Sequence, residues 1–263
     1  MARYFIELAY NGTNYHGWQI QNNCITVQET LEKALSTILN NEIRIVGAGR
    51  TDSGVHAAYM VAHFDVDEQI ENCQWLKNRL NRILPKDIVI ISINPVIDYA
   101  HSRYSAIARR YEYHLTFDKN PFLHELAFYV SYVPDINAMN EAAKVLLNYC
   151  DYTSFCTLPT DVKNFRCTIK YAQWEIRGNR YVFVIEANRF LRRMVRTIVG
   201  SLLEVGRKKI DVQHFVMMIE AHNRCKAGPS APPQGLYLVD IQYPEEIFCS
   251  QAQKDIYLPF KWK

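Results

Sequence analysis

Strand-like and helix-like segments alternate along this chain, and both halves repeat the same ingredients. Residues 3–10 and 110–117 alternate apolar and polar side chains, which is typical of strands with one buried face. Residues 26–38 instead bring apolar side chains together at helical spacing. Strands interleaved with long helices in each half predict an α+β protein of two similar lobes, with an extended, mostly antiparallel sheet and helices on one side of it.

Local signals mark where several elements begin and end. Thr26 and Glu29 have the spacing of a capping box at a helix start, and Gly178-Asn179 is a hairpin signal between two strand-like runs. We expect further strands at residues 59–66, 88–93, 169–176, 181–187 and 236–243. Further helices are expected at residues 73–84, after Asp135, at 189–205 and at 211–222.

Two prolines indicate where the lobes meet. Pro121 and Pro134 punctuate the stretch 118–134, and proline disfavours the continuation of a helix or a central strand. We therefore predict an N-terminal lobe at residues 1–120 and a C-terminal lobe at residues 121–263.

The bulk composition narrows the class of protein. Of the 263 residues, 49% are hydrophobic, so a packed core is expected. The net charge of +3 is too small to indicate nucleic-acid binding by itself. Evidence for such binding must come from where the positive charges cluster. The seven cysteines form no CxxC pair and no zinc-finger spacing, which favours free thiols in a reducing compartment. Without a signal-peptide pattern or an apolar run of roughly 18 to 20 residues, we expect a soluble, cytoplasmic protein with no membrane partner.

The stretch Gly49–Ala57, GRTDSGVHA, carries the strongest chemical signal. It places a cation, a carboxylate and two hydroxyls between glycines, and two apolar runs flank it. Glycine permits the tight turns and close approaches that such a loop needs. Asp52, two residues from Arg50, is a candidate catalytic acid or nucleophile, and the alternative is an ordinary turn.

Two basic clusters are candidates for RNA contact. If residues 189–205 form one helix, its arginines line one face and predict a phosphate-binding surface with one arginine turned inward to a buried carboxylate; the alternative is a solvated face. These arginines are Arg189, Arg192, Arg193 and Arg196. The second cluster joins Arg103-Tyr104 to Arg109–Tyr113. Guanidinium groups hold phosphates and tyrosine rings stack on bases, although core packing is the better prediction for Tyr113. We expect Arg103, Arg110, Arg192 and Arg193 to contact RNA.

Metal and cofactor chemistry finds little support. His56, His63, Asp52 and Asp65 lack a further ligand at a convincing spacing, and closed metal sites need three or four ligands. The chain contains no P-loop, GxGxxG, GxSxG or HExxH motif. We expect no metal and no cofactor.

Ordered blocks from end to end resemble one family. The blocks are Tyr10-Asn11-Gly12 through Gly17-Trp18-Gln19, Thr26-Val27-Gln28, residues 49–57, Arg103–Ala106 with Arg110–Tyr113, Phe190–Arg196, Ala227–Pro233 and Gly235–Leu238. Together they are similar to the TruA-type tRNA pseudouridine synthases. Ala100 and Ser102 depart from the family pattern, which more often has an aromatic residue and an alanine at these positions.

The resemblance implies roles for particular residues. Asp52 matches the family's catalytic aspartate, and Tyr111 matches the tyrosine that stacks on the target uracil. Arg50 matches the arginine that helps to hold or flip the nucleotide. Arg196 matches the inward arginine that pairs with the aspartate, and Leu236 matches an aliphatic residue that lines the pocket. The implied active site is a cleft between the lobes.

The resemblance also implies the reaction and the partners. The family isomerises uridine to pseudouridine at tRNA positions 38, 39 and 40 in the anticodon arm, so the expected partner is tRNA and no cofactor is required. It works as a homodimer. An enzyme must extrude a stacked base before it can act on it. The sequence leaves open whether Asp52 attacks the sugar or the base, and which tRNAs are substrates.

Three alternatives make different demands on the sequence. A non-catalytic RNA-binding module would not need a carboxylate beside Arg50, because Asp52 would repel phosphates. A metal-dependent hydrolase or nuclease would need more acidic ligands near Asp52. A methyltransferase would need a glycine-rich cofactor loop after the first strand, where only Gly12 and Gly17 occur.

Overall fold

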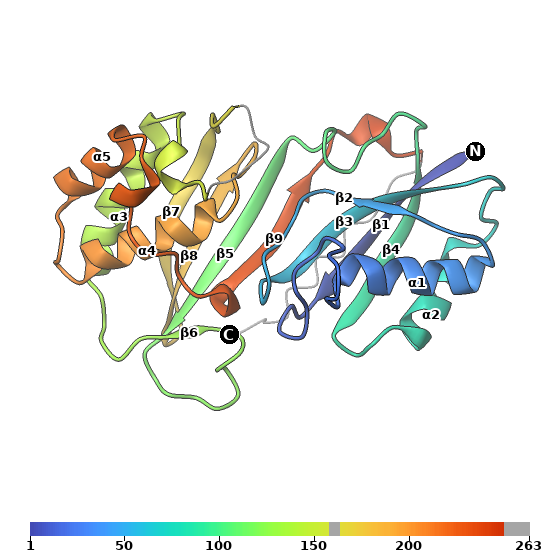
Figure 1. Ribbon diagram of the computed structural model, residues 1–263, viewed down its shortest axis with the longest axis horizontal. Coiled ribbons are helices and arrows are strands. Elements are labelled where there is room, and N and C mark those ends of the chain that lie inside the picture. The colour runs from blue at the N-terminus through green and yellow to red at the C-terminus, as the bar shows by residue number, and fades with distance from the viewer. Residues whose placement is uncertain (158–163, 250–263) are drawn as a thin grey trace. The chain divides into compact units, whose positions relative to one another are not determined.

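The computed structural model describes residues 1–157 and 164–249, and it divides into two compact units (Figure 1). Unit 1 is Met1–Ile107 together with the described residues from Tyr237 onward, and unit 2 runs from Ala108 to Leu236. This division differs from the predicted lobes, 1–120 and 121–263. Unit 2 begins at Ala108, and the chain returns to unit 1 at Tyr237, whose partner in the strand pairing is His56 of unit 1.

Unit 1 is built on strands in the order β4-β1-β3-β9. They are β1 (Ala2–Tyr10), β3 (His56–Val66), β4 (Ile88–Val96) and β9 (Leu236–Gln242), and the short β2 (Ile45–Gly47) also pairs with β3. The β1·β3, β1·β4 and β2·β3 pairs are antiparallel, and β3·β9 is parallel. Helices α1 (Val27–Leu39) and α2 (Cys73–Ile83) lie below the strands in Figure 1. A 3-10 turn, Glu245–Ile247, follows β9.

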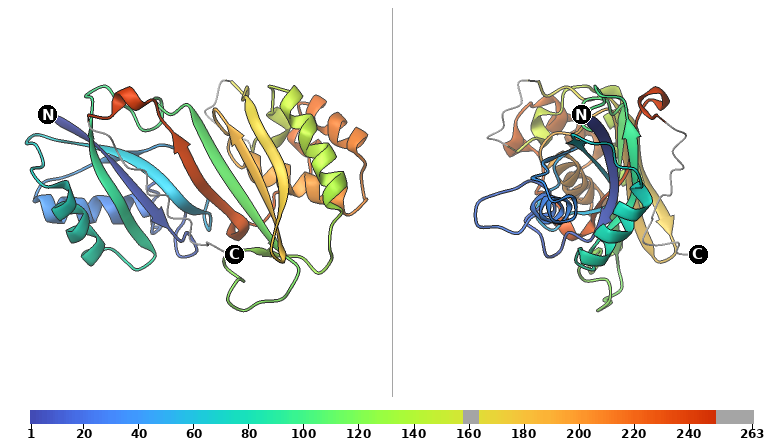
Figure 2. Two further views of the ribbon diagram at one scale, coloured as in Figure 1. Left: turned by 180° about the vertical axis from the view of Figure 1, so that it is seen from behind. Right: turned by 90° about the vertical axis from the view of Figure 1, so that its right-hand side faces the viewer.

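Unit 2 combines three neighbouring strands with a group of helices (Figure 2). The strands are β5 (Ala108–Thr116), β7 (Ile169–Arg177) and β8 (Arg180–Ala187), in the antiparallel order β5-β8-β7, with β6 (Phe128–Tyr129) parallel to β5. The helices are α3 (Ile136–Val145), α4 (Met194–Gly206) and α5 (Val212–Glu220). Short 3-10 turns lie at Leu146–Asn148, Thr153–Phe155, Arg224–Lys226 and Pro233–Gly235. The predicted α+β class with mostly antiparallel strands is confirmed.

Local sequence signals explain several boundaries. The Thr26 side chain accepts a hydrogen bond from the Glu29 N–H at 3.3 Å, as the capping box predicts. The Glu29 carboxylate pairs with Lys33 along the helix instead. The β7–β8 hairpin turns at Gly178, whose φ of 62° suits glycine. All seven cysteines are free thiols, as predicted.

Candidate active site

Asp52 lies in the loop between β2 and β3. The Val55 N–H donates to the Asp52 carbonyl at 3.1 Å, which closes a tight turn over Ser53 and Gly54. Gly54 has a φ of 75°, a left-handed conformation that favours glycine. The turn leaves Asp52 half-buried and Arg50 exposed. We call residues 49–55 the Asp52 loop.

A second loop, residues 11–18, holds the Asp52 loop through main-chain contacts. We call it the clasp. The Trp18 N–H donates to the Thr51 carbonyl at 3.2 Å. The Tyr15 carbonyl accepts hydrogen bonds from the Gly54 N–H and the Ser53 hydroxyl, both at 3.3 Å. Residues on both sides of Asp52 are therefore tied to the clasp.

Two glycines make this close approach possible. A Cβ on Gly12 would collide with the Val55 carbonyl, and a Cβ on Gly17 would collide with the Thr51 carbonyl. Gly17 also has a φ of 86°, which side chains with a Cβ rarely adopt. The two glycines therefore let one backbone lie directly against another.

Buried side chains reinforce the backbone contacts. The hydroxyls of Tyr10 and Thr51 are hydrogen-bonded at 2.8 Å, and both residues are buried. The Gly12 N–H donates to His56 Nδ1 at 3.0 Å, so this nitrogen is an acceptor and the neutral ring carries its proton on Nε2. The His56 ring stacks on Tyr237, with ring centroids 4.6 Å apart.

Asp87, at the start of β4, anchors the clasp. Its carboxylate accepts a hydrogen bond from the Tyr15 hydroxyl at 2.6 Å and from the Asn14 amide at 3.2 Å. Its carbonyl accepts from the Asn11 N–H at 2.9 Å. Burial and the bond to Asp87 raise the pKa of Tyr15 above its usual range, so the phenol stays a donor at neutral pH.

Unit 2 carries the predicted uracil-stacking residue. Tyr111 lies on β5 opposite Ile185 of β8 and is half-buried. Its ring meets Phe190 edge to face, with centroids 5.1 Å apart. Tyr113 is fully buried and its hydroxyl donates to the Pro232 carbonyl at 2.8 Å. The core assignment of Tyr113 is therefore correct, and burial raises its pKa.

Arg196 is held at the first turn of α4. Its Nε donates to the Ala231 carbonyl at 2.8 Å, and the Ala231 N–H donates back to the Arg196 carbonyl at 2.8 Å. Leu236 opens β9 and is 6% exposed. Asp52 and Arg50 belong to unit 1, whereas Tyr111, Arg196 and Leu236 belong to unit 2. Pairing of Arg196 with Asp52 stays a prediction.

The predicted helix over residues 189–205 begins later than expected. Helix α4 starts at Met194, and Arg193 adopts a left-handed conformation with a φ of 59°. A left-handed residue interrupts a right-handed helix, so Arg189, Arg192 and Arg193 precede the helix. The proposed stripe of arginines on one helical face is therefore wrong, because only Arg196 lies on α4. Arg192 and Arg193 are exposed.

The other predicted RNA-binding arginines have protein partners. Arg110 on β5 donates from Nε and Nη2 to one oxygen of Glu186 on β8, at 2.9 and 2.7 Å. The guanidinium of Arg103 lies 5.7 Å from the centre of the Tyr104 ring. Contact of either residue with RNA stays a prediction.

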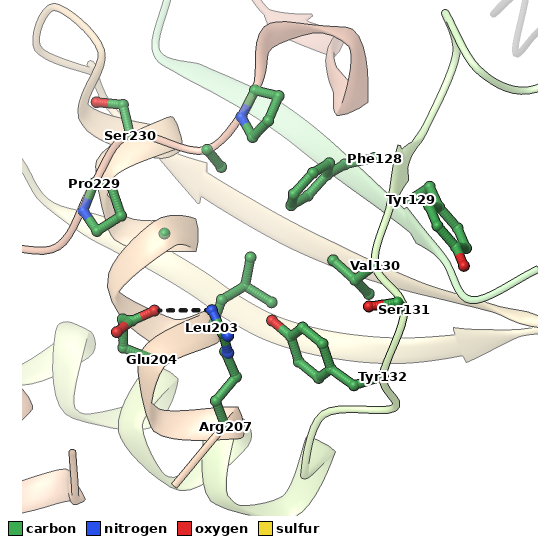
Figure 3. A pocket seen from close by; sticks show the side chains of 13 residues that line it. Phe128, Tyr129, Val130, Ser131, Tyr132, Leu203, Glu204, Arg207, Pro229 and Ser230 are labelled. Carbon is green, nitrogen blue, oxygen red and sulfur yellow. Dashed lines mark ion pairs between the residues drawn. The ribbon is translucent and has the colours of Figure 1, made fainter. Parts of the chain in front are cut away.

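A surface hollow in unit 2 lies apart from these residues. Figure 3 shows it between the segment after β6, the second half of α4 and the loop before β9. Arg207 pairs with Glu204 at 3.6 Å and lies 4.9 Å from the centre of the Tyr132 ring. The predicted site residues do not line it. Ala231 lines this hollow, however, and its carbonyl accepts the hydrogen bond from Arg196.

Sequence reasoning missed the residues that position Asp52. Tyr10, Tyr15 and Asp87 carry no chemistry by themselves, and Asp87 lies 35 positions after Asp52 in the chain. The spacing of Gly12 and Gly17 was the available signal, because two glycines in a short polar loop indicate close backbone contact.

Within residues 1–157 and 164–249, no group of three or more His, Cys, Asp or Glu side chains could hold a metal ion. No helix in the described part of the chain is long and apolar enough to span a membrane.

Comparison with known proteins identifies the family. The model of the tRNA pseudouridine synthase family matches residues 8–105 and 142–244. A protein from Parabacteroides distasonis named tRNA pseudouridine synthase A is 53% identical over 248 residues, which cover 94% of this chain and 98% of that protein. A protein of the same name from Bacteroides thetaiotaomicron is 50% identical over 259 residues, 97% of this chain and 96% of that protein.

The chain therefore belongs to the tRNA pseudouridine synthase family. This membership confirms the predicted resemblance and the predicted isomerase class. It disfavours a non-catalytic RNA-binding module.

Proposed function

We propose that this protein isomerises uridine to pseudouridine at positions 38, 39 and 40 of tRNA, with Asp52 as the catalytic carboxylate. The observation that carries the assignment of Asp52 is its mounting: the clasp holds the residues on both sides of it, while its own side chain stays half-buried. Rigid backbone mounting is what a catalytic group needs, because displacement by about 1 Å can cost about 100-fold in rate.

The reaction is an isomerisation, so the composition of the RNA does not change, and it needs a carboxylate. The N1–C1′ bond breaks, the uracil turns, a C5–C1′ bond forms, the C5 proton leaves and N1 gains a proton. Ionised Asp52 serves as the nucleophile or stabilises the positive charge that develops at C1′. We further propose that Tyr111 stacks on the uracil, Arg50 holds the flipped nucleotide, Leu236 lines the pocket and Arg196 supplies the positive partner of the carboxylate.

The finer partner assignments belong to the same proposal. We propose a homodimer that works in the cytoplasm, where its tRNA substrate is found, with Arg103, Arg110, Arg192 and Arg193 in contact with RNA. Equilibrium sedimentation at micromolar concentration tests the dimer, and a monomer at that concentration contradicts it.

The test compares the wild-type protein with Asp52→Ala on unmodified tRNA, without added metal or cofactor. We expect pseudouridine at the three positions from the wild type, a rate at least about 10³-fold lower for Asp52→Ala, and similar tRNA affinity. Asp67→Ala is the matched control, because Asp67 is an exposed carboxylate outside the loop. Full activity of Asp52→Ala would contradict the assignment, and tight tRNA binding by an inactive wild type would leave an RNA-binding protein.

A further inference from the structure

The loop after β4, residues 97–107, presents two aromatic rings to solvent. Tyr99 is 81% exposed and Tyr104 is 76% exposed. Rings exposed to this extent are able to stack against a partner. We call this segment the Tyr104 loop.

Hydrogen bonds hold the centre of the loop rigidly. Ser102 is fully buried, and its hydroxyl donates to the Val46 carbonyl on β2 at 2.6 Å. The Tyr243 hydroxyl donates to the Ser102 carbonyl at 2.5 Å. Ser102 therefore connects the loop to both β2 and the segment after β9.

The His101 ring shapes the exposed part. Its Nδ1 accepts from the N–H groups of Arg103 and Tyr104, at 3.1 and 3.3 Å. The Ser105 N–H donates to the His101 carbonyl at 2.9 Å, and the His101 N–H donates to the Ser105 hydroxyl at 3.0 Å. Tyr104 therefore projects from a compact turn, and little conformational freedom remains for a partner to remove.

A series of ring contacts, tilted or edge to face, ends at Tyr104. Phe5 and His63 are 6.4 Å apart between ring centroids, His63 and His101 are 4.6 Å apart, and His101 and Tyr104 are 4.4 Å apart. Burial, with the nearby His101 and Arg3, lowers the pKa of His63 to about 4. The ring of His63 is therefore neutral at pH 7.

We propose that Tyr104 and Arg103 form a stacking platform for an unpaired base of the RNA substrate. The Arg103 guanidinium lies over the Tyr104 ring, 5.7 Å from its centre, so a base that stacks here meets both the ring and the cation. Ring plus guanidinium is the combination that holds splayed bases in single-stranded RNA. Family membership supplies an RNA partner, and this inference rests on the proposed function.

The platform holds a base other than the reacting uridine. The Asp52 loop precedes His56, whereas His101 contacts His63, and these two histidines are seven residues apart on β3. That separation spans about 23 Å of extended strand. The Asp52 loop and the Tyr104 loop therefore lie at opposite ends of β3 (Figure 1). The contacted base lies several nucleotides from the target.

The test measures tRNA affinity and turnover for Tyr104→Ala, Tyr104→Phe and Arg103→Ala. We expect Tyr104→Ala to raise both Kd and KM about tenfold and to leave kcat within about twofold of the wild-type value. Tyr104→Phe keeps the ring and stays near the wild type. A plot of log binding constant against log salt concentration has a negative slope, and Arg103→Ala should make this slope shallower by about 0.7 to 0.9. Tyr104→Ala should leave the slope unchanged.

Trp75→Ala is the matched control. Trp75 on α2 is 47% exposed, and the Arg79 guanidinium lies 5.6 Å from its ring. The substitution therefore removes a similar ring–guanidinium pair, and we expect it to leave Kd unchanged. Four results would each overturn the platform. The first three are an unchanged Kd in Tyr104→Ala, a loss of affinity in Tyr104→Phe equal to that in Tyr104→Ala, and the same loss of affinity in Trp75→Ala. The fourth is a change in oligomeric state without a change in Kd. Failure of the proposed function looks different, because the wild type itself then makes no pseudouridine.

Discussion

The Asp52 loop and the arginine-rich segment 189–193 carry proposed chemistry and are held in opposite ways. Backbone hydrogen bonds, two glycine contacts and a buried hydroxyl pair fix the first. The second precedes α4, with Arg192 and Arg193 exposed and Arg193 left-handed. A carboxylate that must meet one atom needs a rigid mount, whereas long cations that meet phosphates can adapt.

The largest expected effect comes from breaking the clasp at Gly17. Gly17→Ala places a Cβ against the Thr51 carbonyl at a positive φ. We expect about 2–4 kcal/mol lower stability and about 100-fold lower kcat, measured by urea unfolding and tRNA turnover. Gly49→Ala is the control in the same loop, because its Cβ meets nothing within 4 Å. Equal stability loss in both variants would contradict the clasp.

A buried histidine of unit 1 gives the stability a dependence on pH. His63 is 5% exposed, and burial lowers its pKa from 6.5 to about 4. The unfolded chain therefore takes up the proton first, so stability is full above pH 6.5 and falls as pH drops towards 4. Between pH 6.5 and pH 4 the free energy of unfolding falls by about 3 kcal/mol.

Urea unfolding at several pH values tests this expectation. His63→Asn keeps a polar side chain near Ser102 and should flatten the pH dependence between 6.5 and 4. His214→Asn is the control, because its side chain is 62% exposed. An unchanged acid loss in His63→Asn would assign the pH dependence to other groups.

The hydroxyl pair beside Asp52 should have a smaller effect. Tyr10→Phe and Thr51→Val each remove one partner of a buried hydrogen bond, at about 1–3 kcal/mol. We expect kcat to fall about tenfold, and the double variant to lose less than the sum because both substitutions break one contact. Tyr4→Phe is the control, since Tyr4 accepts from the Ile70 N–H away from the loop. Additive losses would show that the two hydroxyls act separately.

The smallest effect belongs to the exposed segment. Arg193→Gly removes the strain of a left-handed residue with a Cβ, so thermal unfolding should show about 1 kcal/mol higher stability than for Arg193→Ala. Both variants should lower tRNA affinity equally, because both lose the same charge. Lower stability of the glycine variant would mean that the left-handed conformation is not strained.

Prediction succeeded where the signal was local. The Thr26 cap, the Gly178 turn and the strand expected at residues 110–117 each depend on neighbours in the chain, and the structure contains all three. Burial does not alternate along that strand, because Glu112, His114 and Thr116 are buried as well. Prediction failed for the start of α4, because arginine spacing fits a helix and nothing local reveals the left-handed Arg193. It also missed Asp87, whose contacts to Tyr15 and Asn14 cross more than 70 positions.

The sequence by itself determined the fold class, the helix caps and the identity of the Asp52 loop, because these depend on residue type and short spacing. Only the tertiary structure decided how that loop is held. Tyr10 meets Thr51, Gly12 meets Val55 and Asp87 meets Tyr15 because β1, β3 and β4 pair and bring their ends together. Such pairing depends on packing across the whole sheet, which no short segment encodes.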